Sequence, residues 1–353
     1  MAGSDRGVDG RWAARAEIAE RAVREHYLTS VFGVPGALLG LPRHPATPAD
    51  HARLRWNYWW QAHLLDCLVD AQLRAPEHAR ARVIARLVRG IRLRNLGAWT
   101  NAYYDDIAWL GLALLRAGAA TGLPVRRPVA AILARLRSGW TEHAGGGIWW
   151  RRGDLFKNVP ANGPAAILFA RTGAADRAAA ALEWMDRTLL DARTGLLWDG
   201  VHLRPDGSVR ERVEIVYTYC QGVFLGACVE LSTSDLAART IRAVDEYVAV
   251  GGVLPGQGGG DGGLFAGILA RYLAQSALRL PDAEGERARA LVFDSAEAAW
   301  QHRTATAAGP VFGADWTHRS PQDPRLNGDL SVQLSGWMVI EAAALLERAS
   351  MTV

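Results

Sequence analysis

Apolar residues recur at spacings of three and four along almost the whole of this 353-residue chain. That spacing places them on one face of an α-helix, and runs that alternate with a period of two, which would predict strands, are scarce. Clusters of Gly, Pro and Asp divide the pattern into segments. Twelve helices are predicted, at 11–29, 49–74, 76–94, 101–119, 124–140, 161–172, 174–191, 214–231, 234–250, 261–278, 284–304 and 329–349.

An even series of helices joined by short links predicts an all-α fold. We expect six helical hairpins closed into an (α/α)6 barrel, with six inner and six outer helices. No segment has the composition of an interdomain linker, so residues 1–353 are expected to form a single domain. The longest irregular stretches are 141–160, 192–213, 251–262 and 305–328, and such loops on a rigid scaffold commonly carry function.

The charge balance and the cysteines limit the classes of function. Forty basic residues against 36 acidic ones give a net charge of +4, which is too balanced for a protein built around nucleic acid. Lys157 is the only lysine. Three cysteines without a CxxC spacing make no disulfide framework and fit a reducing compartment.

The first residues and the apolar runs of the chain indicate where the protein is expected to be located. The first residues resemble an amphipathic helix rather than a signal peptide, so the protein is expected in the cytoplasm, or outside the cell if this start is truncated. The chain has no uninterrupted apolar run of about 18 residues, so we expect no membrane span. We expect a monomer that contacts neither membrane nor nucleic acid.

The sharpest chemical feature is a pair of consecutive carboxylates at the start of a strongly apolar helix. Asp105 and Asp106 follow two tyrosines, and Trp109 lies one turn further on. Capping is one explanation, because Asp in a first turn accepts backbone hydrogen bonds and complements the helix dipole. Glycoside hydrolysis is the other, because it needs two carboxyl groups beside the sugar, and aromatic rings suit its faces. Like charges this close separate their pKa values, which leaves one acid protonated.

Two further segments carry polar and aromatic residues suited to sugars. A glycine run at 145–147 precedes two tryptophans, and two asparagines one helical turn apart follow; the alternative is a tight turn with buried tryptophans and an Asn cap. The segment 217–222 opens another helix, and core packing is its alternative role. The candidate sugar contacts from all segments are Tyr104, Trp149, Trp150, Asn158, Asn162, Asp199, Tyr219 and Gln221.

Taken together, the motifs resemble glycoside hydrolase family 76, the α-1,6-mannanases. They occur in the order YYDDIAW, GGIWW, KNVPANGPAAILFAR, TGLLWDG, YTYCQGVFLGACVEL and SGWMVIEAAALLE, and span most of the chain. The resemblance implies a single-domain (α/α)6 barrel and a retaining mechanism, with Asp105 as nucleophile and Asp106 as acid/base. It also implies a mannose-containing oligo- or polysaccharide as the partner, and neither a cofactor nor a metal. Cys220 departs from the family, which often has Asn there.

Two alternatives to this function remain open from sequence. One is another barrel enzyme acting on carbohydrate, a transglycosidase or a sugar epimerase; an epimerase would need paired histidines, and the nine histidines form no obvious pair near the aspartates. The other is a non-catalytic glycan-binding protein, although binding alone does not require two adjacent acids.

Overall fold

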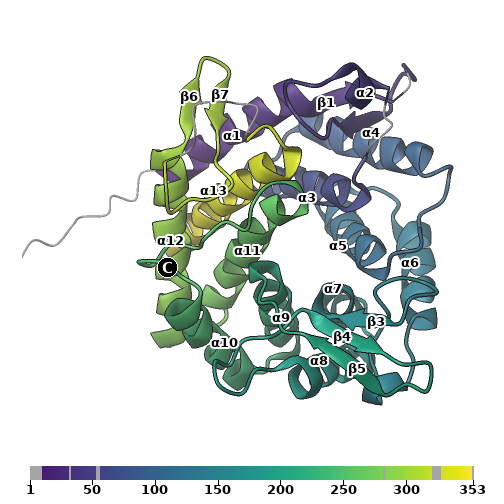
Figure 1. Ribbon diagram of the computed structural model, residues 1–353. Coiled ribbons are helices and arrows are strands. Elements are labelled where there is room, and N and C mark those ends of the chain that lie inside the picture. Colours follow the sequence, from purple (N-terminus) through teal and green to yellow (C-terminus); the bar gives the residue numbers. More distant parts are fainter. Residues whose placement is uncertain (1–9, 32, 53–55, 281–282, 320–326, 352–353) are drawn as a thin grey trace, which may run out of the picture.

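The computed structural model describes residues 10–31, 33–52, 56–280, 283–319 and 327–351 (Figure 1). Six helices form an inner ring in which each contacts the next and the last contacts the first. The inner helices are α3 (Tyr58–Arg74), α5 (Tyr104–Thr121), α7 (Val159–Arg171), α9 (Thr218–Leu231), α11 (Phe265–Ala277) and α13 (Leu330–Met351). The predicted (α/α)6 barrel is therefore confirmed.

Six outer helices pack on this ring, and each precedes an inner helix in the chain (Figure 1). They are α1 (Arg11–Tyr27), α4 (His78–Arg94), α6 (Arg126–Ser138), α8 (Ala175–Leu189), α10 (Ser234–Tyr247) and α12 (Ala283–His302). All twelve predicted helices are present. The single domain stays a prediction, although the closed ring of hairpins favours it.

The two rings differ in how their residues are buried. Every residue of the inner helix α11 except Gln275 is buried, as expected for a helix surrounded by others. The outer helix α10 buries only a stripe of small and apolar residues. By length and composition α13 could cross a membrane, but 94% of its apolar window is buried within the barrel, which makes it a core helix.

The boundaries differ from the prediction in two places. The segment expected as one helix at 49–74 contains a short α2 (Pro48–His51) and then α3, and residues 53–55 lie outside the described part. The segment at 261–278 begins as a 3-10 turn, η2 (Gly260–Leu264), before α11. Residues 320–326 of the irregular stretch 305–328 also lie outside the described part.

Three small antiparallel sheets were not predicted, because strands of three to five residues are too short to show a period of two. The largest joins β3 (Phe156–Asn158), β4 (Gly200–Leu203) and β5 (Val209–Val213), with Asn158 opposite Gly200. The others pair β1 (Leu28–Ser30) with β2 (Leu38–Gly40), and β6 (Thr304–Thr306) with β7 (Gly309–Val311).

Four of the six inner helices carry a buried amide side chain at their fourth residue. Each amide accepts from the N–H and donates to the C=O of one residue in the segment between its own helix and the preceding outer helix. The pairs are Gln61 with Gly40, Asn162 with Ile148, Gln221 with Leu197 and Gln333 with Phe312. These amides replace the strand partner that a buried loop would otherwise lack, and so attach the loops to the ring.

The middle of the barrel is closed by buried ion pairs. Asp66 and Asp70 of α3 each pair with both Arg116 of α5 and Arg271 of α11. Burial opposes ionisation of Asp66, but the two guanidinium groups outweigh burial and hold its pKa below the usual value. The network joins three inner helices below the helix starts, where the loops gather.

Candidate active site

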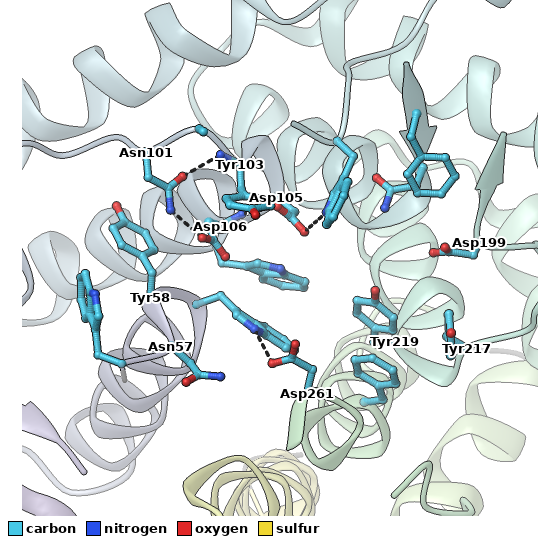
Figure 2. Close-up of a pocket in the computed structure, with 18 of the residues that line it drawn as sticks. Asn57, Tyr58, Asn101, Tyr103, Asp105, Asp106, Asp199, Tyr217, Tyr219 and Asp261 are labelled. Carbon is cyan, nitrogen blue, oxygen red and sulfur yellow. Dashed lines mark hydrogen bonds between the residues drawn. The ribbon is translucent and has the colours of Figure 1, made fainter. Parts of the chain in front are cut away.

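A cavity of about 1080 Å³ lies where the inner helices begin (Figure 2). Its lining comes from the first turns of α3, α5, α9 and α11 and from the loops that lead into them and into α7. Helix N-termini carry partial positive charge and unpaired N–H groups, so their convergence favours negative charge in the cavity. The position explains why the two adjacent acids begin a helix.

Both carboxylate oxygens of Asp105 accept a hydrogen bond. Its Oδ1 accepts the backbone N–H of Asp106 at 2.9 Å, and its Oδ2 accepts the indole N–H of Trp150 at 3.0 Å (Figure 2). Burial raises the pKa of Asp105 to about 6, and these two hydrogen bonds oppose the rise. Asp105 is therefore a carboxylate at neutral pH, with its oxygens fixed in direction.

Asp106 has the opposite protonation preference. Burial, and next the charge of Asp105, raise the pKa of Asp106 well above its usual value. Its Oδ2 accepts from Nδ2 of Asn101 at 2.5 Å, and the Asn101 amide is oriented because its oxygen accepts the N–H of Tyr103. With Oδ2 engaged as an acceptor, the acid proton belongs on Oδ1. One buried pair thus holds a base and an acid side by side.

Aromatic rings form one wall of the cavity. Tyr219 and Phe265 stack with ring centroids 3.9 Å apart and planes 6° from parallel. Trp59 lies beside both, with centroids 6.4 and 6.3 Å away. Flat ring faces beside polar groups are typical of a site that binds sugar rings.

Asp199 lines the cavity on the side away from Asn101 and Tyr58 (Figure 2). Burial, together with the negative charge of Asp105, raises the pKa of Asp199 to about 7. The thiol of Cys220 donates to its Oδ1 at 3.9 Å. The residue that departs from the family pattern is itself fully buried and contacts Asp199 rather than the cavity.

The structure brings together six of the ten residues expected in the site from sequence. Those that line the cavity are Asp105, Asp106, Trp150, Asn158, Asp199 and Tyr219. Asn158 also caps α7, since its side chain accepts the N–H of Ala161 at 3.2 Å. Capping and cavity lining therefore coexist at this residue.

The other four residues, Tyr104, Trp149, Asn162 and Gln221, do not line the cavity, and their side chains make contacts elsewhere. Asn162 and Gln221 are fully buried, and their side-chain amides form hydrogen bonds with the backbone of Ile148 and Leu197. Tyr104 is buried with its ring against Gly139, where a Cβ would come within 2.5 Å of it. Trp149 covers Lys157, whose Nζ is 4.6 Å from the indole centroid.

Lys157 has a structural position. Its ammonium donates to the carbonyls of Thr141, His143 and Gly146 at 2.6–2.8 Å. Burial lowers its pKa to about 7, while three carbonyl acceptors match the three donors of the charged form. The residue thereby holds the loop that ends in Trp150, one step away from Asp105.

Several lining residues were missed by sequence reasoning, among them Asn57, Trp59, Asn101, Asp261 and Phe265. Asn101 stands five residues before Asp106, and an amide side chain so close to the acids was a usable signal. Asp261 lies in the irregular stretch 251–262, which belongs to the loops expected to carry function, but no pattern in the sequence singled out this residue. Trp59 and Phe265 look like core residues in sequence.

Two groups of side chains are absent from the described residues that line the cavity. No histidine is among the described residues that line it. Nor do those residues contain a group of three or more His, Cys, Asp or Glu side chains that could hold a metal ion.

Comparison with known proteins agrees with this geometry. The family model for glycosyl hydrolase family 76 matches residues 12–353. The GH76A α-1,6-mannanase from Salegentibacter sp. HEL1_6 has a similar structure, with a TM-score of 0.84 and 32% identity over 95% of this chain and 99% of that chain. An inactive variant of that enzyme, with two consecutive aspartates replaced by asparagine, was solved with α-1,6-mannotriose; it is 31% identical, with the same TM-score and coverage.

A protein from Listeria innocua, Lin0763, is 27% identical with a TM-score of 0.83, over 96% of this chain and 98% of that one. No curated protein matches the chain.

Proposed function

Because the chain belongs to glycoside hydrolase family 76, we propose that it cleaves α-1,6-linked mannosides with retention of configuration, using Asp105 as nucleophile and Asp106 as acid/base. It is a glycoside hydrolase by membership of that family. The linkage, the sugar and the two roles are the parts of the proposal that the site must support.

The observation that carries the proposal is the buried aspartate pair that lines the cavity, in which Trp150 donates to Asp105 and Asn101 donates to Asp106. Asp105 and Asp106 are the only two consecutive aspartates in the chain. The Salegentibacter mannanase is inactive when two consecutive aspartates are replaced, and that variant binds α-1,6-mannotriose. A carboxylate beside a protonated carboxyl is the combination that retaining glycosidases require.

In the first step, an oxygen of Asp105 attacks the anomeric carbon from the face opposite the leaving group. The bond from that carbon to the glycosidic oxygen breaks, and Asp106 gives its Oδ1 proton to the departing oxygen. The indole N–H of Trp150 keeps Asp105 ionised and aimed until attack. A covalent glycosyl-enzyme results, and Asp106 is left as a carboxylate.

In the second step, Asp106 takes a proton from a water molecule as the water oxygen attacks the anomeric carbon. The bond to Asp105 breaks, and both acids regain their starting forms. Loss of the Asp105 charge in the intermediate lowers the pKa of Asp106, since that charge is one cause of its elevation. The same carboxyl is thus an acid in the first step and a base in the second.

The shape of the site suits an oligosaccharide. A second cavity of about 640 Å³ shares the lining residues Asn57 and Asp261 with the first, so the two cavities are neighbours. Inactive variants of the Salegentibacter mannanase were solved with α-1,6-mannotriose and α-1,6-mannotetrose. We propose that several mannose units bind in these two neighbouring cavities, with the cleaved linkage over the aspartates.

Product analysis tests the proposal. Wild-type protein incubated with linear α-1,6-mannan and with α-1,6-mannohexaose is expected to yield shorter oligosaccharides, and Asp105→Ala none. Proton NMR of the first minutes is expected to show the α-anomer as the initial product, as retention requires. Asp176→Ala, the same change on the exposed surface of outer helix α8, is the matched control and keeps full activity. A β-anomer as first product, or an active Asp105→Ala, would contradict the assignment.

A further inference from the structure

Asp261 binds two tryptophans with a single oxygen. Its Oδ1 accepts the indole N–H of Trp59 at 2.9 Å and that of Trp60 at 2.8 Å. Trp59 and Trp60 open inner helix α3, two hundred residues away in the chain. One carboxylate oxygen therefore fixes the tilt of the indole that completes the aromatic wall, and both indole hydrogen bonds go to Oδ1 rather than to Oδ2.

The loop that carries Asp261 is held on both sides. Gln257 accepts the N–H of Thr218 at 2.8 Å and donates to the carbonyl of Val216 at 3.1 Å, which ties the loop to the start of α9. Gly260 donates to Oδ2 of Asp329 at 2.9 Å, and its carbonyl accepts the hydroxyl of Ser331.

The glycines of this loop are required by its path. Gly260 has a φ of +58°, and a Cβ on Gly262 would lie 2.1 Å from the carbonyl oxygen of Gln257. This tight, anchored backbone presents Asp261 in one place, which costs little further ordering when a ligand binds.

Asp261 stands where the two cavities meet. It lines both the catalytic cavity and the second cavity, and its carboxylate is exposed to them (Figure 2). The second cavity is also lined by Trp60, Arg43, Asp50 and Asp329. Because Asp261 lines both cavities, an oligosaccharide that occupies both lies beside this side chain.

We propose that Asp261 is a specificity-determining residue that fixes Trp59 with one oxygen and accepts the hydroxyl groups of a bound sugar unit with the other. The inference rests on the proposed function. It adds a residue that binds a mannose unit away from the cleaved linkage. Paired sugar hydroxyls are donors that a carboxylate oxygen accepts in short, charge-assisted bonds.

The electrostatics agree with an acid that faces the catalytic pair. The charge of Asp261 is among the causes that raise the pKa of both Asp105 and Asp106, behind burial in each case. Solvent in the cavity screens this exposed charge, so its main effect is through contact and not through the field.

Two substitutions separate the two contacts. Asp261→Asn keeps an oxygen that can accept from both indoles, but replaces the second acceptor by an NH2 donor. Asp261→Ala removes both contacts. We measure kcat and KM for α-1,6-mannotriose and α-1,6-mannohexaose, and the affinity of mannotriose in an Asp105→Ala background, where nothing is cleaved. Thermal unfolding verifies that each variant is folded.

Asp261→Asn is expected to raise KM about 10-fold with kcat nearly unchanged, the loss of one hydrogen bond to a charged group. Asp261→Ala is expected to lower kcat/KM about 100-fold, since Trp59 also loses its partner. Wild-type KM in both variants, or equal losses in both that follow only the loss of thermal stability, would overturn the inference. A wild-type protein that neither cleaves nor binds α-1,6-mannosides would instead refute the proposed function, and this inference with it.

Discussion

The side-chain amide of Asn101 donates a 2.5 Å hydrogen bond to Oδ2 of Asp106. This contact decides which oxygen of Asp106 carries the proton, and it favours the ionised form against the burial that opposes it. Because Asn101 precedes α5, the loop that positions it also positions the acid.

Asn101→Ala is expected to raise the pKa of Asp106 further and to leave its carboxyl free to rotate. The basic limb of the pH profile of kcat/KM then moves to higher pH, while kcat falls about 10- to 100-fold from misplacement of the proton donor. Initial rates on α-1,6-mannohexaose between pH 4 and 9 measure both effects. A basic limb that moves to lower pH would show that Asn101 acts otherwise.

Trp150→Phe removes the N–H that Asp105 accepts at 3.0 Å and keeps most of the ring. That hydrogen bond opposes the rise in the pKa of Asp105, so its loss raises the pKa above about 6 and moves the acidic limb to higher pH. We expect kcat/KM at pH 6 to fall about 10-fold or more, the value of a hydrogen bond to a charged group. Equal activity at pH 8 and at pH 6, relative to wild type, would contradict this account.

Asp199→Asn is expected to stabilise the protein at neutral and alkaline pH. The pKa of Asp199 is raised to about 7 in the folded state, from a usual value of 3.8. A carboxyl group whose pKa is raised by folding costs no stability below pH 4. The cost grows as the pH rises from 4 to 7 and is complete above pH 7. The amide has no such cost.

The gain is about 1–3 kcal/mol at pH 8 and close to zero at pH 4, allowing for partial contact with solvent. Urea unfolding at the two pH values measures it, and Asp176→Asn on the exposed surface serves as the control. A gain that is larger at pH 4 than at pH 8 would be the wrong sign.

Asn162→Ala and Gln221→Ala are expected to lower stability without a specific effect on sugar binding. Each leaves a buried loop N–H and C=O unpaired, at a cost of about 1–3 kcal/mol per unpaired group. The midpoint temperature of thermal unfolding should fall in both variants. KM for α-1,6-mannohexaose should stay within about twofold of wild type at a temperature where both variants remain folded. A large rise in KM without loss of stability would restore these residues to the sugar site.

The outer helices were predictable from a one-sided apolar stripe, as in α10, and the inner helices from long apolar segments that Gly, Pro and Asp bound. The Asp pair was predictable as well, since two acids before an apolar helix are unusual enough to stand out. Asn162 and Gln221 were misplaced for a physical reason: a buried amide facing a loop backbone and one facing a sugar occupy the same position in the sequence. Only the packing of loop against ring separates them.

Asp261 was missed because its role depends on contacts across the ring. It meets Trp59 and Trp60 only when α11 closes beside α13 and α13 beside α3. No local pattern connects positions 59 and 261, whereas the 3.6-residue period that predicts a helix is entirely local.

The most direct test of the two catalytic roles is the configuration of the azide formed by variants acting on an aryl α-1,6-mannobioside. Its activated leaving group needs no acid. With azide added, Asp105→Ala is expected to yield the β-mannobiosyl azide, because azide enters from the face that Asp105 vacates. Asp106→Ala is expected to yield the α-azide, because azide then opens the covalent intermediate formed on Asp105. The opposite pair of configurations would contradict the assignment of nucleophile and acid/base.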